Sequence, residues 1–337
     1  MTTQTSKHFA LSLACLGLML SASVSLAQGK LAVPPMFRHQ PSSSSPAVVQ
    51  KAQPGGSSYT YTLFDYPETF YTIGAALNVG ATGKVEIVGC YGNPPLLGTE
   101  SFRVYGSESK GTITEAYQGV NVPGSPPQCA FGVNDSGQIV GEYLDSASVY
   151  HGWELSGGTF TTIDVPFSGA SGTGTNGISD SGEITGFWDG SGITLHGFTL
   201  ISGTYTSFDY PGAVQTGPFG INNNGDIVGY YEFSDLVEHG FVLSGGTYTS
   251  IDPPGSVFTY AAGINDAGDI VGAYCTTSTC RDSFIGLQGF LLSKGVFTIF
   301  AIPGATGTGL QAINDKGLIL GAYYDVAGFE HDFVAVP

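Results

Sequence analysis

The stretch Gly220-Ile221-Asn222-Asn223-Asn224-Gly225-Asp226-Ile227-Val228-Gly229 decides the fold, because it recurs from one end of the chain to the other. Its pattern, G-[IV]-[NS]-x-x-G-x-I-[VT]-G, is repeated at residues 132–141, 177–186 and 263–272, and two looser copies lie at 77–89 and 312–321. The glycines at the turn of five copies, residues 137, 182, 225, 268 and 317, are spaced by 45, 43, 43 and 49 residues. A period of this size indicates one supersecondary unit per repeat.

Two further signatures follow each copy in a fixed order. The first is His-Gly-aromatic, which starts at His151, His196 and His239, with variants at Gln288, His331 and Glu100. The second is a run of Thr and aromatic residues that ends in Asp-x-Pro, with its aspartates at Asp65, Asp164, Asp209 and Asp252. Degraded copies of this run lie at 117–123 and 297–303, so each signature occurs six times.

Each period is predicted to hold about four short strands. The Asn-x-x-Gly step joins two apolar runs, and glycine accepts the positive φ that a tight hairpin turn with a bulge requires. Side chains alternate with period two on both sides of it, at 227–231 and again at 239–243, which is typical of strands. A further strand over 248–252 ends at Pro253, since proline cannot donate to a ladder.

Four antiparallel strands in every 40 to 50 residues predict an all-β fold, a six-bladed β-propeller. The last repeat ends after its His-containing strand at 331–337, and the Asp-x-Pro strand at 61–67 has no partner before it. We expect these N- and C-terminal strands to share one blade, because closure removes the exposed sheet edges that an open array leaves. The alternative is an open β-solenoid.

The two motifs in fixed order resemble the bacterial extracellular repeats named for a His-Ala-Phe tripeptide, the HAF family, with Gly in place of Ala in most copies. The resemblance covers about residues 59–337. It implies a secreted repeat protein, and it supplies no catalytic residues, because the activity of that family is mostly unknown.

The chain divides into three parts. Residues 1–27 are predicted to be a secretory signal peptide, with Lys7 before an apolar core and small residues before Gln28. Cys15 makes a lipoprotein signal the alternative. Residues 28–58 are rich in Pro and Ser and are predicted to be a disordered leader. Residues 59–337 form the propeller, and no second stretch is long enough for a transmembrane anchor.

Charge and cysteine content restrict the partners and the cellular compartment that we expect for this protein. The formal net charge is −17, so the protein is acidic and nucleic acid is not an expected partner. Four cysteines remain after signal cleavage, an even number that suits a secreted or periplasmic protein. We expect the disulfides Cys275–Cys280 and Cys90–Cys129, each in one of the longer repeats.

Repeated polar residues are predicted to be structural. His151, His196, His239 and His331 occupy equivalent positions in different repeats, which spreads them around a ring, so we expect hydrogen bonds to backbone or to the Asp-x-Pro aspartates rather than a metal. Asp65, Asp164, Asp209 and Asp252 recur in the same way and are predicted to form turns before proline. No cofactor is expected. Calcium at the Asn-x-x-Gly turns is the open alternative, although the twelfth position from Asn222 is Phe233 instead of Glu.

The leading functional hypothesis is a non-catalytic, secreted monomer that binds a glycan, a protein or a surface component through its loops. Candidate binding residues are Tyr230, Tyr231, Arg281 and Asp282. The alternative is a carbohydrate-active hydrolase or lyase at the channel mouth, which requires two carboxylates outside the repeat pattern to converge. The candidates for that pair are Glu86, Glu115, Glu142 and Asp282. A structural repeat protein without a specific ligand is the third possibility.

Overall fold

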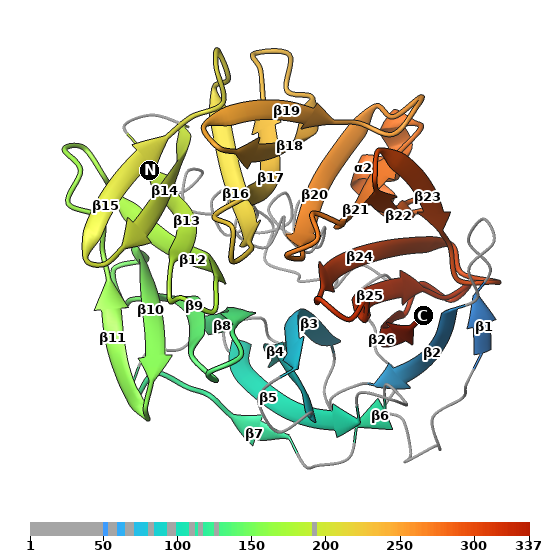
Figure 1. Ribbon diagram of the computed structural model, residues 1–337, viewed down its shortest axis with the longest axis horizontal. Helices are drawn as coiled ribbons and strands as arrows, with labels where there is room; N and C mark the ends of the chain where they lie inside the picture. The colour runs from blue at the N-terminus through green and yellow to red at the C-terminus, as the bar shows by residue number, and fades with distance from the viewer. Residues whose placement is uncertain are drawn as a thin grey trace, which may run out of the picture.

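The computed structural model describes residues 50–52, 59–64, 71–79, 84–92, 99–107, 112–113, 117–124, 128–190 and 194–337. Short antiparallel sheets stand around a central axis in these ranges, and the innermost strand of each sheet faces that axis (Figure 1). The arrangement is a β-propeller, as the repeat pattern predicts. The predicted signal peptide, most of the leader and Asp65 lie outside the described residues.

Strand pairing groups the described strands into six units, which we number along the chain. The second to fifth units each contain four antiparallel strands. The second unit is β8 (Gln128–Val133), β9 (Ile139–Leu144), β10 (Tyr150–Ser156) and β11 (Thr159–Ile163). The third is β12 (Gly172–Ile178), β13 (Ile184–Asp189), β14 (Leu195–Ile201) and β15 (Thr204–Phe208). The fourth is β16 (Gln215–Ile221), β17 (Ile227–Glu232), β18 (Glu238–Ser244) and β19 (Thr247–Ile251). The fifth is β20 (Phe258–Ile264), β21 (Ile270–Cys275), β22 (Gln288–Ser293) and β23 (Val296–Phe300). A single parallel pair, Leu195 with Gln215, links the third unit to the fourth.

The first unit is less regular in its outer part. It consists of β3 (Tyr71–Val79), β4 (Lys84–Gly92) and β5 (Thr99–Ser107), and β5 pairs with two short strands, β6 (Thr112–Ile113) and β7 (Gln118–Gly119). These two pieces together take the place of one outer strand.

The sixth unit joins the two ends of the chain. Its inner strands are β24 (Gly307–Ile313), β25 (Ile319–Tyr324) and β26 (Glu330–Val336), and β2 (Tyr59–Phe64) completes it by pairing antiparallel with β26. Figure 1 shows the blue β2 beside the red β26. The predicted closure by N- and C-terminal strands is therefore confirmed. A further strand, β1 (Gln50–Ala52), pairs with β2, so three residues of the predicted disordered leader form a strand.

In the second to sixth units the innermost strand is joined to its neighbour by the Asn-x-x-Gly turn, with Ser179 in place of Asn in the third. In the fourth unit the Asn222 carbonyl accepts the Gly225 N–H at 3.1 Å, and the Asn222 Oδ1 accepts the N–H groups of Asn224 and Asp226 at 3.0 and 2.9 Å. Gly225 has φ +78°, a left-handed value that glycine adopts without a steric penalty. We call the face that carries these turns the turn face.

Each middle strand contains a glycine where it lies opposite a β-bulge of the innermost strand, and this glycine allows the two backbones to approach closely. Every innermost strand shifts register near its centre, as between Pro218 and Gly220 in β16. Opposite this shift, a Cβ added to Gly229 would lie 2.1 Å from the Gly217 carbonyl oxygen. The last glycine of the G-x-I-V-G pattern is therefore required by close backbone approach.

The aromatic residue of each His-Gly-aromatic signature forms the core between neighbouring units. The side chains concerned are fully buried, namely Phe102, Trp153, Phe198, Phe241, Phe290 and Phe333. Burying a side chain of this size stabilises a fold by about 2 to 3 kcal/mol. The variants of this signature keep the aromatic residue while the histidine is lost in two of them, so packing is the constant part of the motif.

Both expected disulfides are present. Cys90 of β4 is bonded to Cys129 of β8, which joins the first unit to the second, and Cys275 is bonded to Cys280. The second pair encloses the first residues of α2 (Ser278–Ser283), a short helix that the sequence analysis did not predict. Two disulfides are typical of an oxidising compartment. Among the described helices, none has the length and apolar character needed to cross a membrane.

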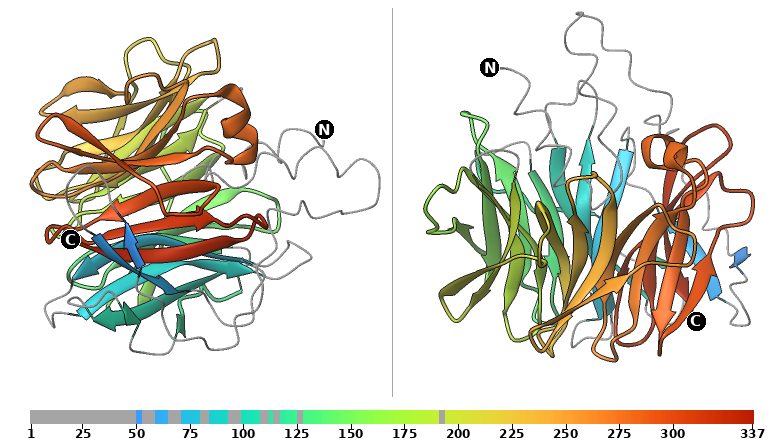
Figure 2. Two further views of the ribbon diagram at one scale, coloured as in Figure 1. Left: turned by 90° about the vertical axis from the view of Figure 1, so that its right-hand side faces the viewer. Right: turned by 90° about the horizontal axis from the view of Figure 1, so that it is seen from above.

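The helix α2 lies on the face opposite the Asn-x-x-Gly turns. The strand β20 runs toward its turn at 265–269, and β21 runs back and ends at Cys275, directly before α2. The side view in Figure 2 shows α2 projecting from one face of the disc. We call this the helix face.

Candidate functional site

A module of three side chains recurs near the helix face, in the outer part of three units. A residue of the middle strand, Tyr143, Trp188 or Tyr231, lies directly opposite the histidine of the next strand, His151, His196 or His239. The rings stack at centroid distances of 5.1, 4.3 and 5.3 Å, with interplanar angles of 21 to 25°. The third member is the aspartate of the Asp-x-Pro run.

The aspartate fixes the protonation pattern of the imidazole. Asp164, Asp209 and Asp252 accept hydrogen bonds from the Nδ1 atoms of the three histidines at 2.8, 2.9 and 3.1 Å. A carboxylate accepts these hydrogen bonds, so Nδ1 carries a proton in each module. In the second unit the other ring nitrogen of His151, Nε2, lies 3.6 Å from Asp145 Oδ2. The predicted His–Asp hydrogen bonds are thus present at these three sites, and the aspartates do more than end a strand.

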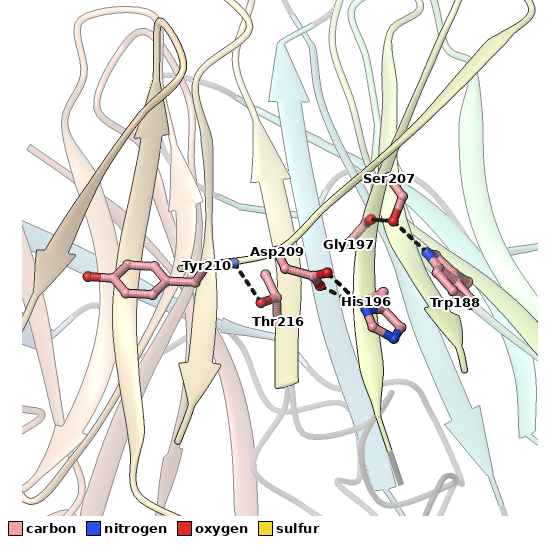
Figure 3. Close-up of polar contacts among 7 residues, drawn as sticks. All are labelled: Trp188, His196, Gly197, Ser207, Asp209, Tyr210 and Thr216. Atoms are coloured by element: carbon pink, nitrogen blue, oxygen red, sulfur yellow. Dashed lines mark hydrogen bonds and ion pairs between the residues drawn. The ribbon is translucent and has the colours of Figure 1, made fainter. Parts of the chain in front are cut away.

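The third unit shows the module most openly (Figure 3). The His196 ring lies between the indole of Trp188 and the carboxylate of Asp209, whose two oxygens are 2.9 and 3.0 Å from Nδ1. The Trp188 Nε1–H donates to Ser207 Oγ at 3.0 Å, which fixes the plane of the indole. The side chains of His196 and Asp209 are 26% and 46% exposed, so a ligand can reach them from solvent.

The other units vary the module in ways that keep its polar contact. In the fourth unit, Tyr231 OH and Asp252 Oδ2 are joined through Ser250 Oγ at 3.0 and 2.6 Å. In the fifth, the Tyr274 hydroxyl donates to Gln288 at 2.7 Å, and in the first, Tyr91 donates to Glu100 at 2.9 Å. In the sixth, His331 lies 5.1 Å from the ring of Tyr323, and the matching Asp65 is outside the described residues.

In the second and third units, the residue after the aspartate links the module to the next unit by a hydrogen bond. The backbone N–H groups of Val165 and Tyr210 donate to Thr173 Oγ1 and Thr216 Oγ1 of the following innermost strands at 3.1 and 2.9 Å. Figure 3 shows the second of these links beside the His196 pair. The position of the aspartate is therefore set by contacts between blades.

The corresponding hydrogen bond between the fourth and fifth units is absent among the described residues. The residue that follows Asp252 is Pro253, which has no N–H, and the buried Thr259 Oγ1 is left without a hydrogen-bond partner among the described residues.

The predicted binding residues lie in different environments. Tyr230 and Tyr231 are 3% and 5% exposed, and Tyr231 stacks on Tyr210 at 3.5 Å, so burial argues against direct ligand stacking by either. Arg281 is on the surface of α2, where its side chain is 31% exposed. Asp282 is the next residue of that helix, and its side chain lies outside the described part of the structure.

Arg281 crosses from the fifth unit to the fourth. Its guanidinium donates to the Leu236 carbonyl at 2.8 Å and to Glu238 Oε1 at 2.7 Å. Burial raises the pKa of Glu238 to about 7; Arg281 opposes this shift and the neighbouring Glu232 adds to it. Burial also raises the pKa of Glu232. The cluster is a buried ion pair with an excess carboxylate, held on the helix face.

The carboxylates proposed for the catalytic alternative do not form a pair in the described residues. Glu86 lies beside Gly137 in the turn of the second unit, whereas Glu142 lies against Gly174 of the third. Burial raises the pKa of Glu86. Glu115 and the side chain of Asp282 are outside the described residues. No observation therefore favours glycoside hydrolysis by these groups.

The Asn-x-x-Gly turns converge on a cavity of about 210 Å³ at the mouth of the central channel. The residue after the recurring Asn or Ser accepts a backbone N–H from the preceding unit at 2.7 to 2.8 Å, in the pairs Asp135 to Asp180, Asp180 to Asn223, Asn223 to Asp266 and Asp266 to Asp315. The sequence argument missed this convergence. Its signal was an Asp or Asn at the same position of five copies.

The calcium alternative at these turns finds no ligand set. Within the described ranges, no group of three or more His, Cys, Asp or Glu side chains is close enough to hold a metal ion. The Asn222 Oδ1 is directed to backbone N–H groups of its own turn, as described above.

Comparison with known proteins supports the fold. No family model matches the chain, and no curated protein matches it. AofleA from Arthrobotrys oligospora is similar in structure, with a TM-score of 0.50, 15% identity and coverage of 89% of this chain and 90% of that one. A Trypanosoma rangeli sialidase mutant with trans-sialidase activity aligns with a TM-score of 0.51 and 10% identity. The alignment covers 87% of this chain and 57% of the sialidase.

A lectin from Aleuria aurantia, described as a six-bladed β-propeller with a novel fucose recognition mode, aligns with a TM-score of 0.46 and 14% identity. The alignment covers 79% of this chain and 96% of the lectin. At these identities, the structural similarity bears on the fold alone.

Proposed function

We propose that the protein is a secreted, monomeric bacterial repeat protein of the HAF type that binds glycans without catalysing a reaction, through the repeated aromatic–histidine–aspartate modules. The observation that carries the proposal is the partly exposed pair of an imidazole and an aspartate, joined at Nδ1, that recurs in three units. In the second and third units its neighbour, Tyr143 or Trp188, is a partly exposed aromatic ring that offers apolar surface for the C–H groups of a pyranose. The aspartate adds further acceptor sites for sugar hydroxyls.

Repetition is the second support. The module is present in the second, third and fourth units, and equivalent positions on a propeller lie well apart around its rim. Each module alone is shallow and is expected to bind weakly. A polysaccharide that reaches several modules gains avidity, because each additional contact forms within one complex.

The test is a glycan array and a polysaccharide pull-down with residues 28–337, with release of sugar assayed on every polymer that binds. The triple variant His151→Phe, His196→Phe and His239→Phe keeps an aromatic ring at each module and removes the imidazole nitrogens and their hydrogen bonds to the aspartates. We expect saturable binding without product release, and a loss of about tenfold or more in apparent affinity in the triple variant.

Asp135→Asn on the opposite face is the matched control and is expected to bind as the parent protein does. Unchanged glycan binding by the triple variant would refute the modules as the binding site. Release of sugars would replace the binding function by an enzymatic one.

A further inference from the structure

The cavity on the turn face combines an aliphatic wall with an acidic rim. The wall consists of the residue that precedes Asn or Ser in each turn, namely Leu77, Val133, Ile178, Ile221, Ile264 and Ile313, each 6 to 8% exposed. Six aliphatic side chains from six units thus surround one space. A methylene chain or the apolar face of a small ring fits such a wall.

The rim of the same cavity carries more negative than positive charge. Asp135, Asp180, Asp266 and Asp315 line it, and Lys316 is the lining residue with a positive side chain. Four carboxylates and one ammonium give a formal charge of −3. Asn223 lies between two of the acids, since its Nδ2 donates to Asp180 and Asp266 at 2.7 and 2.8 Å.

The acids of the rim raise one another's pKa. Burial raises the pKa of Asp135, and the charges of Asp180 and Asp315 add to the shift. The pKa of Asp315 is raised by burial and by the charges of Asp266 and Asp180, against the lowering effect of the Asp266 backbone N–H. Ionised carboxylates around one cavity favour a positively charged ligand.

A buried acceptor beside the rim has no partner among the described residues. The amide Nδ2 of Asn78 donates to the Asn134 carbonyl of the next unit, as Asn222 does to Asn265 at 3.0 Å. The Asn78 Oδ1, in contrast, makes no hydrogen bond there, although Asn78 lines the cavity and is 5% exposed. A buried acceptor without a donor is unfavourable, so this position favours a ligand that supplies an N–H or O–H group.

Wall, rim and acceptor together define the ligand. We propose that the channel mouth binds a small organic cation, a primary ammonium on an aliphatic or sugar body. The ammonium donates to Asn78 Oδ1 and to the rim carboxylates, and the carbon skeleton packs on the aliphatic wall. This site is on the opposite face from the glycan modules and does not depend on them.

The experiment is calorimetric titration of the purified protein with cadaverine, glucosamine and N-acetylglucosamine at low ionic strength. Cadaverine offers methylenes and ammonium groups, glucosamine an amino sugar, and N-acetylglucosamine the same sugar without the charge. We expect one saturable site for the cationic probes and no binding of N-acetylglucosamine. Comparison of cadaverine with glucosamine distinguishes an alkylamine from an amino sugar as the source of the ammonium.

The variant Asp135→Asn, Asp315→Asn keeps the acceptor oxygens that hold neighbouring backbone N–H groups and removes two charges, so we expect an affinity loss of about tenfold or more. Asp235→Asn, which removes an exposed carboxylate in the loop between β17 and β18 on the helix face, is the control and is expected to change the affinity by less than about twofold.

Equal losses in the two variants would show diffuse attraction to an acidic protein and would overturn the proposal, as would the absence of a saturable site. If the double variant fails to fold, the wild-type protein still decides. Pentylamine must bind more tightly than methylamine, because both carry one ammonium group and the longer chain covers more of the wall. Equal affinity would overturn the proposal. Failure of the glycan test leaves this result unaffected, since the two sites share no residue.

Discussion

Replacing Glu238 by glutamine should change how the stability of the protein depends on pH. The Glu238 side chain is 12% exposed, and its pKa is raised from 4.5 to about 7 by burial, against the attraction of Arg281. Between pH 4.5 and 7 the folded protein keeps this proton while the unfolded chain releases it. Raising the pH through this range therefore destabilises the wild-type protein, and above pH 7 the loss is complete.

The size of the effect follows from the shift. A rise in pKa from 4.5 to about 7 corresponds to about 3.5 kcal/mol at most, since one pKa unit is about 1.4 kcal/mol. The glutamine side chain of the Glu238→Gln variant does not titrate, so the variant gains this amount relative to the wild type between pH 4.5 and 7. The substitution also leaves Arg281 without its carboxylate, which adds an offset that pH does not change. In a domain of this size the gain amounts to about 5 to 10 °C in Tm.

The assay is thermal unfolding of both proteins from about pH 4.5 to about pH 8.5 at constant ionic strength, a range that brackets both pKa values. The difference in Tm, variant minus wild type, should rise up to about pH 7 and then stay level. Glu183→Gln, a partly exposed carboxylate close to the turn face, controls for the loss of one charge. A flat difference, or one that falls with pH, would refute the argument that burial dominates over the Arg281 pair.

Three further predictions concern the frame. Gly229→Ala should destabilise the protein by several kcal/mol in urea unfolding, because its Cβ would overlap a backbone carbonyl at 2.1 Å, whereas Gly203→Ala meets open space and should lose only about 1 kcal/mol for its φ of +80°. Removing the Cys90–Cys129 disulfide should cost about 4 kcal/mol and removing Cys275–Cys280 about 2 kcal/mol, since the partners are 39 and 5 residues apart in sequence; equal losses would contradict the loop-length argument. Deleting residues 1–64 should expose the edge of β26 and produce concentration-dependent association in light scattering, and a monomer of unchanged Tm would show that β2 is dispensable.

Sequence periodicity predicts the propeller fold because the same local chemistry recurs in each unit. The turn at Asn222, the bulge glycines and the strand-ending prolines act within one repeat, so their roles follow from one copy. The closure by β2 followed from the order of motifs at the two ends of the chain. The burial of Tyr230 and Tyr231 could not be predicted from the sequence. Alternation of residue types distinguishes the two faces of a strand, but it does not show that neighbouring units cover both faces.

The helix α2 shows a second limit of the sequence. The spacing of Cys275 and Cys280 predicted the disulfide, but the path between them depends on contacts with the fourth unit through Arg281. The contact of Arg281 with Glu238 joins residues 43 positions apart and leaves no periodic signal.

Symmetry has opposite consequences at the rim and at the axis of a propeller. Residues in equivalent positions of the outer strands, such as His151 and His196, remain in separate modules, so repetition there yields several weak sites. Residues at the innermost turns lie close to the axis, where Asp135 and Asp180 are linked directly by a hydrogen bond between units. Repetition there yields a single cavity with a multiplied charge. Repeated acids therefore stay apart on the outer strands, but they converge at the channel mouth. This difference explains why we propose several weak glycan modules at the rim and a single site for a cationic ligand at the axis.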